Sequence, residues 1–320
     1  MYVARFDYRS PGATNTERSR LYRESLEMAR WVDERGCMSL VVSEHHSTAD
    51  GYLPSPLQVA AAMAAVTERT QITVAVAVLP FYDPIRLAED LITLDHLSAG
   101  RVMVVLGLGY RETEYDLYGV DFGSRGRIAD QKLEALLSHL DASRRAELLP
   151  RVTPTPFSEP RPLLAWGGKS KAAARRAGRF GLGFYAQTNT PGLREAFRGA
   201  AESSGQKPGF CFLPPPDAPY AVFVNDDVDT GWNDVGQALL NDASGYQEWN
   251  DDITEIASFS SSVTVDALRA EQGAHRVVSS QGVGELLSEH GFVSLHPLCG
   301  GLAPDTAWPY LRRAVGVLNP

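Results

Sequence analysis

Cysteine is scarce in this sequence. Only three occur among 320 residues, Cys37, Cys211 and Cys299, and no two of them form a Cys-x-x-Cys pair. Disulfide frameworks and structural zinc sites need several cysteines at close spacing. The sequence therefore argues against both and favours a reducing compartment.

Positive charge and long apolar runs are also lacking. Lys and Arg number 30 against 39 Asp and Glu, a formal net charge of −9. This argues against nucleic acid as a partner, because phosphate binding needs clustered basic residues. No apolar run reaches membrane-span length, and residues 1–9 lack a basic segment followed by an apolar one. We expect a cytoplasmic protein that binds neither nucleic acid nor membrane.

Short β-type runs alternate with helical stretches along the chain, which is long enough to bury a large core. The expected strands are residues 2–6, 38–43, 72–79, 101–106, 161–166, 182–186, 220–224 and 292–296. Eight such β/α units are typical of a (β/α)₈ TIM barrel, and a doubly wound open sheet is the alternative. We predict a single α/β domain over 1–320, with a Pro-rich connector at 150–162. An insertion at 246–280 follows the seventh strand and carries a further short strand at 275–279.

Local signals mark where several helices begin. Thr14 and Glu17 have the spacing of a capping box, and Ser55 with Pro56 opens the next helix. Asp83 and Pro84 begin a third. The first helix has an apolar stripe that we expect to be buried, formed by Leu21, Ser25, Met28, Ala29 and Val32.

The stretch VVSEHHST (41–48) ends a β-type run with Glu44, His45 and His46. Adjacent residues on a strand point to opposite sides, so both histidines cannot hold one metal ion, and we predict no metal site here. A histidine at a strand end beside a carboxylate is suited to acid–base catalysis, which favours His45 with Glu44. The alternative is a polar strand end in water.

Other polar side chains also follow expected strands. Tyr110 and Arg111 come after the fourth strand, and His296 ends the eighth. In a barrel the carboxyl ends of all strands meet at one face, so these three residues are candidates for a substrate pocket.

Two glycine-rich segments invite comparison with nucleotide-binding loops. GLGYRE (107–112) lacks the third glycine of a dinucleotide fingerprint, because Glu112 stands there. WGGKS (166–170) lacks the first glycine of a Walker A motif, because position 163 is Leu. Gly167, Gly168, Lys169 and Ser170 nevertheless lie between a strand and a helix, where backbone N–H groups and an ammonium favour an anion. A purely structural turn is the alternative.

Four segments together resemble the bacterial luciferase-like family of flavin-dependent oxidoreductases. They are SEHHS (43–47) and residues 78–127, 163–184 and 295–311, about half of the chain. The resemblance implies a TIM barrel that uses reduced FMN, delivered by a separate flavin reductase, and O₂. The activity implied is a monooxygenase acting on a small organic substrate such as a secondary metabolite. A homodimer is also implied.

The resemblance also assigns roles to individual residues. His45 matches the active-site histidine of the family, with Glu44 before it. The phosphate-binding turn matches residues 167–170. A non-prolyl cis peptide beside the flavin ring maps onto Ala75 and Val76, and Gly107 and Leu108 fall at the cofactor as well.

Two departures from the family keep alternatives open. The light-emitting members have a reactive cysteine where Gly107 stands, so nothing indicates luminescence. Many FMN-using members have an arginine where Leu108 stands, and here Lys169 or Arg111 would have to supply that charge. An oxidoreductase that uses the deazaflavin F420 and transfers hydride without O₂ is therefore the first alternative. A non-catalytic partner subunit or small-molecule binding protein is the second.

Overall fold

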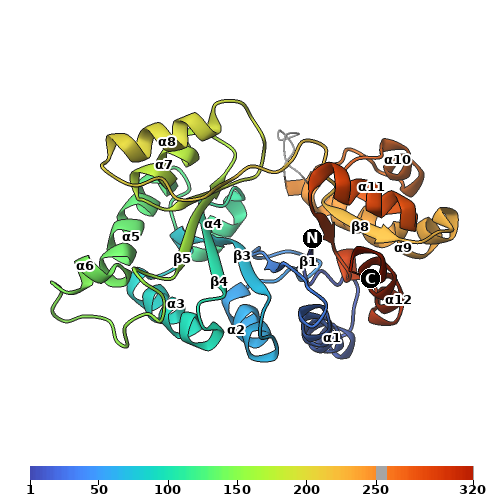
Figure 1. Ribbon diagram of the computed structural model, residues 1–320, viewed down its shortest axis with the longest axis horizontal. Coiled ribbons are helices and arrows are strands. Elements are labelled where there is room, and N and C mark those ends of the chain that lie inside the picture. The colour runs from blue at the N-terminus through green and yellow to red at the C-terminus, as the bar shows by residue number, and fades with distance from the viewer. Residues whose placement is uncertain (250–257, 320) are drawn as a thin grey trace. The chain divides into compact units, whose positions relative to one another are not determined.

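The computed structural model describes residues 1–249 and 258–319 (Figure 1). The chain divides into two compact units. Unit 1 comprises Met1–Val42, Thr48–Pro54 and Pro214–Pro320, and unit 2 comprises Ser43–Ser47 and Ser55–Leu213. Each unit contains parallel strands with helices packed on them. No described helix is long and apolar enough to cross a membrane.

The strands of unit 1 lie in the order β2-β1-β10-β8-β9, and every described pair is parallel. They are β1 (Tyr2–Phe6), β2 (Ser39–Val42), β8 (Ala221–Val224), β9 (His275–Val278) and β10 (Val293–Leu295). The helices are α1 (Asn15–Asp33), α9 (Val228–Trp249), α10 (Val265–Glu271), α11 (Ser280–His290), α12 (Pro304–Leu318) and the short 3₁₀ helix η2 (Cys299–Gly301). The last strand pairs with the first, which is the neighbour relation of a closed barrel.

The segment after β8 forms a strand–helix unit of its own. The expected short strand at 275–279 is confirmed as β9, which pairs with β8. The chain reaches β9 through α9 and α10, and then returns through α11 to β10 on the other side of β8. Of the expected insertion at 246–280, residues 250–257 lie outside the described residues.

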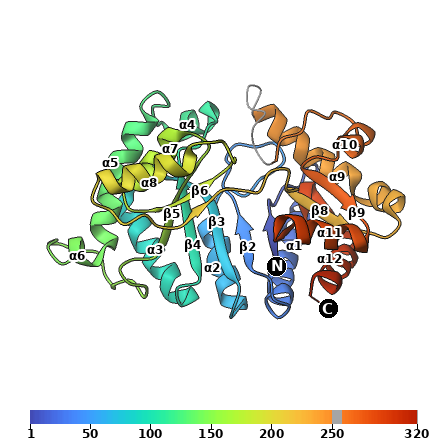
Figure 2. The same cartoon turned by 45° about the horizontal axis from the view of Figure 1, so that its top comes forward.

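The strands of unit 2 follow in simple sequence order, from β3 to β7. They are β3 (Gln71–Val78), β4 (Val102–Gly107), β5 (Leu163–Gly168), β6 (Gly183–Ala186) and β7 (Cys211–Phe212). The helices are α2 (Pro56–Val66), η1 (Leu79–Phe81), α3 (Pro84–Ser98), α4 (Glu112–Tyr118), α5 (Arg125–Leu140), α6 (Ala142–Arg145), α7 (Lys171–Arg179) and α8 (Leu193–Ser203). Helix α2 packs on β3, α3 on β4, and α7 on β5 and β6 (Figure 2). The short elements β7, α4 and α6 were not predicted from the sequence.

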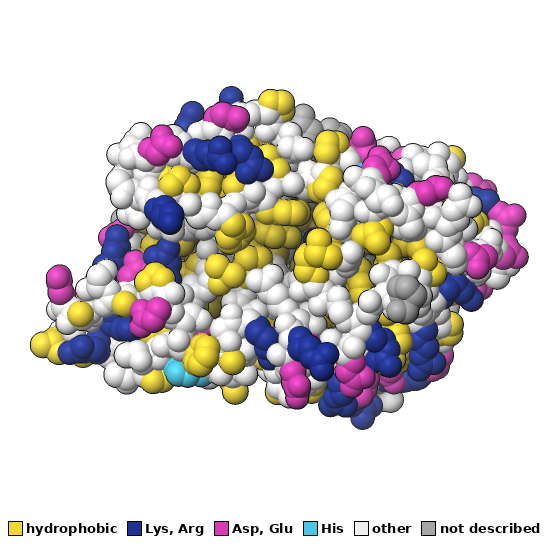
Figure 3. Space-filling model, viewed as in Figure 1, with side chains coloured by type: hydrophobic (Ala, Val, Ile, Leu, Met, Phe, Trp, Pro, Cys, Tyr) yellow, Lys and Arg dark blue, Asp and Glu magenta, His cyan; other side chains and the backbone are white. Residues whose placement is uncertain are grey.

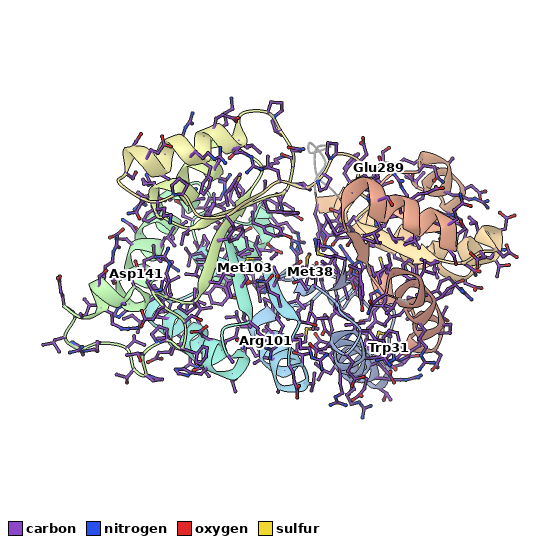
Figure 4. All side chains as sticks on the ribbon, viewed as in Figure 1. Trp31, Met38, Arg101, Met103, Asp141 and Glu289 are labelled. Atoms are coloured by element: carbon purple, nitrogen blue, oxygen red, sulfur yellow. The ribbon has the colours of Figure 1, made fainter. Side chains whose placement is uncertain are left out.

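The predicted start of α1 is confirmed. The Thr14 hydroxyl accepts from the Glu17 N–H, and the Glu17 carboxylate accepts from the Thr14 N–H, which completes the capping box. All five residues of the predicted stripe are buried. On the same helix, Trp31 packs edge-on against Trp308 of α12, with ring centroids 5.9 Å apart (Figure 4).

One face of the unit 2 strands forms a small apolar layer. Met103 and Val105 on β4 and Ala165 on β5 are buried in it, and Met103 is labelled in Figure 4. Ala75, Val76 and Tyr185 pack against this layer from the neighbouring strands. The Ala75–Val76 peptide is cis, as predicted, and the pairing register with β4 shifts between Ala75 and Ala77.

Helices α7 and α8 pack closely because Gly178 has no side chain. A Cβ at Gly178 would collide with the Phe197 carbonyl oxygen and lie 2.8 Å from the Ala201 nitrogen. Gly199, on α8, would have nothing within 4 Å of an added Cβ. The two glycines therefore offer a matched test of this helix pair.

We predict that Gly178→Ala lowers the free energy of unfolding by about 1–3 kcal/mol, because the backbones must move apart. Gly199→Ala should raise it by up to about 1 kcal/mol, through helix propensity alone. Urea unfolding of both variants measures this. Equal effects of the two changes would contradict the close packing of α7 on α8.

Candidate active site

Glu44 is a buried carboxylate with a complete set of partners. One oxygen lies 2.7 Å from His46 Nε2, and the other accepts from the Val78 N–H at 3.0 Å and the Tyr82 hydroxyl at 2.8 Å. Burial, and then the charge of Glu44, raises the pKa of Tyr82 well above its usual value, so Tyr82 remains a donor. Glu44 thus joins the 43–47 segment to the end of β3.

His46 is held in an aromatic wall. Its ring packs edge-on against Phe81 and Tyr118, with centroids 5.6 and 4.8 Å away. The Tyr118 hydroxyl lies 3.2 Å from His46 Nδ1, and Glu44 holds Nε2. Both ring nitrogens are therefore engaged by buried or half-buried groups, which is the environment of a structural histidine.

His45 has a different carboxylate partner. Its Nδ1 lies 3.0 Å from Glu114 Oε1, and the same oxygen accepts from the His46 N–H at 2.9 Å and from Arg111 at 2.9 Å. The expected pairing of Glu44 with His45 is wrong. Side chains alternate along an extended segment, so Glu44 shares a side with His46, and His45 points away from both.

Glu114 stays ionised at neutral pH. Burial raises its pKa, but hydrogen bonds from His45 and the His46 N–H, with the charges of His45 and Arg111, bring the net pKa below its ordinary value. An ionised Glu114 favours the His45 tautomer that carries its proton on Nδ1. His45 Nε2, 3.5 Å from the Tyr110 hydroxyl, is then the nitrogen that can accept a proton.

Glycines shape the strand ends on the same unit. A Cβ at Gly107 or Gly167 would lie 3.0 or 2.9 Å from side-chain atoms of Val76. Neither position accepts a side chain without movement, because Val76 packs directly on the backbone at the ends of β4 and β5. Both glycines are buried, whereas Ala75 and Val76 on β3 are partly exposed.

The turn after β5 has the features of an anion cradle. Gly168 has φ +149°, and a Cβ there would lie 2.7 Å from Ala173. Ser170 caps α7 by accepting from the Ala173 N–H at 3.1 Å. The first N–H groups of a helix lack acceptors within it, and Lys169 adds an ammonium. Lys and Arg side chains also appear over α7 and α8 in the space-filling view (Figure 3).

The remaining predicted residues fall in two places. Tyr110 and Arg111 lie at His45 and Glu114, and Arg111 donates to Glu114 and to the His46 carbonyl. Both of these side-chain contacts of Arg111 are therefore made beside the His45–Glu114 pair. His296 belongs to unit 1, where it is buried 3.5 Å from the Asp7 carboxylate.

Comparison with known sequences identifies one protein family. Residues 4–258 match the family described as luciferase-like monooxygenase. The chain is 33% identical over 116 residues to 4-hydroxyprotoasukamycin monooxygenase from Streptomyces nodosus subsp. asukaensis, covering 36% of this chain and 31% of that protein. It is also 33% identical over 98 residues to limonene 1,2-monooxygenase from Rhodococcus erythropolis, covering 31% and 25%. The matched part spans about a third of the length of the first curated relatives.

Solved structures give the same fold. A monooxygenase from Streptomyces bottropensis has a TM-score of 0.73 at 21% identity, over 99% of this chain and 98% of that one. The FMN complex of the oxygenating constituent of 3,6-diketocamphane monooxygenase from Pseudomonas putida scores 0.66 at 15% identity, over 100% and 98%. An F420-dependent secondary alcohol dehydrogenase scores 0.64 at 15% identity, over 95% and 97%. The predicted luciferase-like TIM-barrel fold is confirmed.

We predict that Glu114→Gln lowers the free energy of unfolding by about 1–3 kcal/mol at pH 7, because Arg111 and His45 lose a buried ionic acceptor. A carboxyl group with a lowered folded pKa stabilises the protein above its unfolded pKa, and this contribution is lost as pH falls. The difference between wild type and variant should therefore hold from about pH 6 to 8 and narrow below about pH 4.5.

Urea unfolding at several pH values measures this difference. Glu112→Gln, an exposed change on the same helix, is the control and should stay within about 0.5 kcal/mol of wild type. A wild-type–variant difference that does not change with pH would show that Glu114 acts by packing and not by charge.

Proposed function

Because the chain belongs to the luciferase-like monooxygenase family, we propose that it is a flavin-dependent monooxygenase. It uses reduced FMN, supplied by a separate flavin reductase, and O₂ to oxygenate a small organic substrate. The observation that carries this proposal is the buried His45–Glu114 pair on the same unit as the partly exposed Ala75 and Val76 of β3. The pair supplies a positioned imidazole, and Ala75 and Val76 supply an apolar surface for a planar cofactor.

The residues of unit 2 fit FMN. The Gly168–Ser170 turn admits a phosphate because Gly168 has no Cβ and α7 begins there with Lys169 beside it. Ala75 and Val76, which are partly exposed, would lie against the isoalloxazine ring. When bound and reduced, this ring supplies the electrons that activate O₂.

In this proposal His45 handles protons. Glu114 fixes its Nδ1–H, so Nε2 accepts a proton from the substrate or returns one to it, with Tyr110 as a neighbouring hydroxyl. The ionised Glu114 stabilises the imidazolium that forms when Nε2 takes the proton. Glu114 is thus a positioning residue, and His45 is the catalytic one.

The aromatic wall covers Glu44 and His46, which are 2% and 5% exposed. Phe81 stacks on Tyr118 with ring centroids 4.5 Å apart, and Tyr115 packs edge-on against Phe81 at 4.8 Å. Glu44 and His46 satisfy each other within this wall and expose no loose proton donor. A site that reduces oxygen needs this protection, because water diverts the oxidising equivalents to hydrogen peroxide.

An F420-dependent hydride transfer is the second candidate, and Leu108 favours it, since an FMN-binding arginine is absent there. Fluorescence titration with reduced FMN and with reduced F420 separates the two. Turnover with a flavin reductase, NADH, FMN, ¹⁸O₂ and a panel of small organic substrates tests the monooxygenase directly. Tight binding of F420 alone, with no ¹⁸O in any product, would overturn the proposal.

We predict that Lys169→Gln weakens the affinity for reduced FMN about 3- to 10-fold, the value of a partly exposed ion pair. The affinity for reduced riboflavin, which has no phosphate, should not change. Lys207→Gln, an exposed lysine of the same unit, is the matched control and should affect neither flavin. Equal losses of affinity for FMN and for riboflavin would show that this turn does not bind the phosphate.

We predict that His45→Gln binds reduced FMN almost normally but forms product about 10²- to 10⁴-fold more slowly, the usual contribution of an acid–base group. The reducing equivalents from NADH should then be released as hydrogen peroxide. Product and peroxide are measured together in the reductase-coupled assay.

His46→Gln is the comparison variant. It should lose thermal stability because Glu44 loses its imidazole partner, while each folded molecule keeps most of its coupling. The assignment of His45 is wrong if His45→Gln keeps wild-type coupling and His46→Gln loses it.

A further inference from the structure

Unit 1 holds a buried polar cluster that the proposed oxygenation does not use. Asp7 follows β1, His296 follows β10, and Cys299 begins η2. One ligand atom from each, a carboxylate oxygen, an imidazole nitrogen and the thiol sulfur, all lie within 4.8 Å of one another. The three side chains are 1%, 1% and 0% exposed. Parallel pairing of β1 with β10 brings the two ends of the chain together at this point.

His296 lacks a partner that its burial demands. Neither of its ring nitrogens has a hydrogen-bond partner among the described residues, although Nε2 lies 3.5 Å from Asp7 Oδ2. A neutral imidazole has a lone pair on one ring nitrogen that can bind a partner. An unsatisfied buried imidazole is costly, so the geometry calls for a further group beside it.

Asp7 is held by backbone N–H groups. Its oxygens accept from the Arg9 N–H and from the Gly300 N–H, each at 3.0 Å. The Arg9 guanidinium lies closer to Asp242, at 3.2 Å, than to Asp7, at 3.8 Å, and also pairs with Asp50. One guanidinium therefore interacts with three carboxylates.

We propose that Asp7, His296 and Cys299 bind a divalent transition-metal ion of the zinc class. Carboxylate oxygen, imidazole nitrogen and thiolate sulfur are all zinc ligands, and the sulfur disfavours magnesium and calcium. The ion would supply the partner that the His296 ring lacks among the described residues. Its binding displaces the Cys299 thiol proton and any proton held by Asp7.

The remaining cluster residues hold these ligands in place. Asp242 lies 2.8 Å from His275 Nε2, accepts from Arg9 and also interacts with the Cys299 thiol. A Cβ at Gly300 would collide with the Ala238 carbonyl oxygen of α9, which fixes the turn that carries Cys299. The ion would therefore link the N-terminal strand to the last strand and η2, independently of flavin binding.

Metal binding is tested on the full chain without flavin. The purified protein is stripped with a chelator and titrated with zinc chloride against a chromophoric competitor, and bound metal is counted by elemental analysis. We expect one zinc ion per chain, a higher midpoint of thermal unfolding and release of protons. Cobalt(II) chloride should give a thiolate-to-cobalt charge-transfer band in wild type. A wild-type protein that binds no stoichiometric zinc, or cobalt without that band, overturns the proposal.

Two cysteine variants give the matched comparison. Cys299→Ser should abolish the charge-transfer band and weaken zinc binding by at least about 100-fold. Cys37→Ser, which removes another buried cysteine of unit 1, should change neither. Cys299→Ser with wild-type zinc affinity would place the ion elsewhere. Because no readout involves flavin or turnover, failure here is distinct from failure of the monooxygenase proposal.

Discussion

The candidate active site depends on the alternation of side chains along one extended segment. At residues 44–46 this alternation sends Glu44 and His46 to one side and His45 to the other. Two buried imidazoles then need two separate carboxylates, and the fold provides Glu44 for one and Glu114 for the other. The separation gives the two adjacent histidines different surroundings: His46 lies between Glu44 and Tyr118, and His45 lies between Glu114 and Tyr110.

The rest of unit 2 holds these two pairs in place. Helix η1 follows β3 directly and places Phe81 in the aromatic wall around His46. The Val78 N–H and the Tyr82 hydroxyl on either side of it donate hydrogen bonds to Glu44. Helix α4 then presents Glu114 to His45. Without either short helix, a buried carboxylate or imidazole would be left unpaired, at a cost larger than the stability such a helix has alone.

The sequence predicts the parts of this arrangement that are local. The capping box at Thr14 and Glu17 involves neighbouring residues, so its pattern is visible in the sequence. Glu114 could not be found in this way, since α4 has seven residues and its carboxylate matters only through a contact 69 positions away. The position of β9 next to β8 could not be predicted either, because the residue pattern of a strand does not show which strand it pairs with. The prediction of a cis peptide at Ala75–Val76 came from the family resemblance alone.

The two buried polar groups differ in how their imidazoles are paired. In unit 2, His45 and His46 each have a carboxylate partner, although the second oxygen of Glu114 has no hydrogen-bond partner among the described residues. In unit 1, Arg9 interacts with three carboxylates, and His296 stands beside Asp7 without a hydrogen bond among the described residues. A buried imidazole without a partner is costly, and a bound cation would supply one. The His-x-x-Cys spacing at 296–299, together with Asp7 across the β1–β10 pair, provides the nitrogen, sulfur and oxygen donors that a cation requires, whereas a proton needs only one of them.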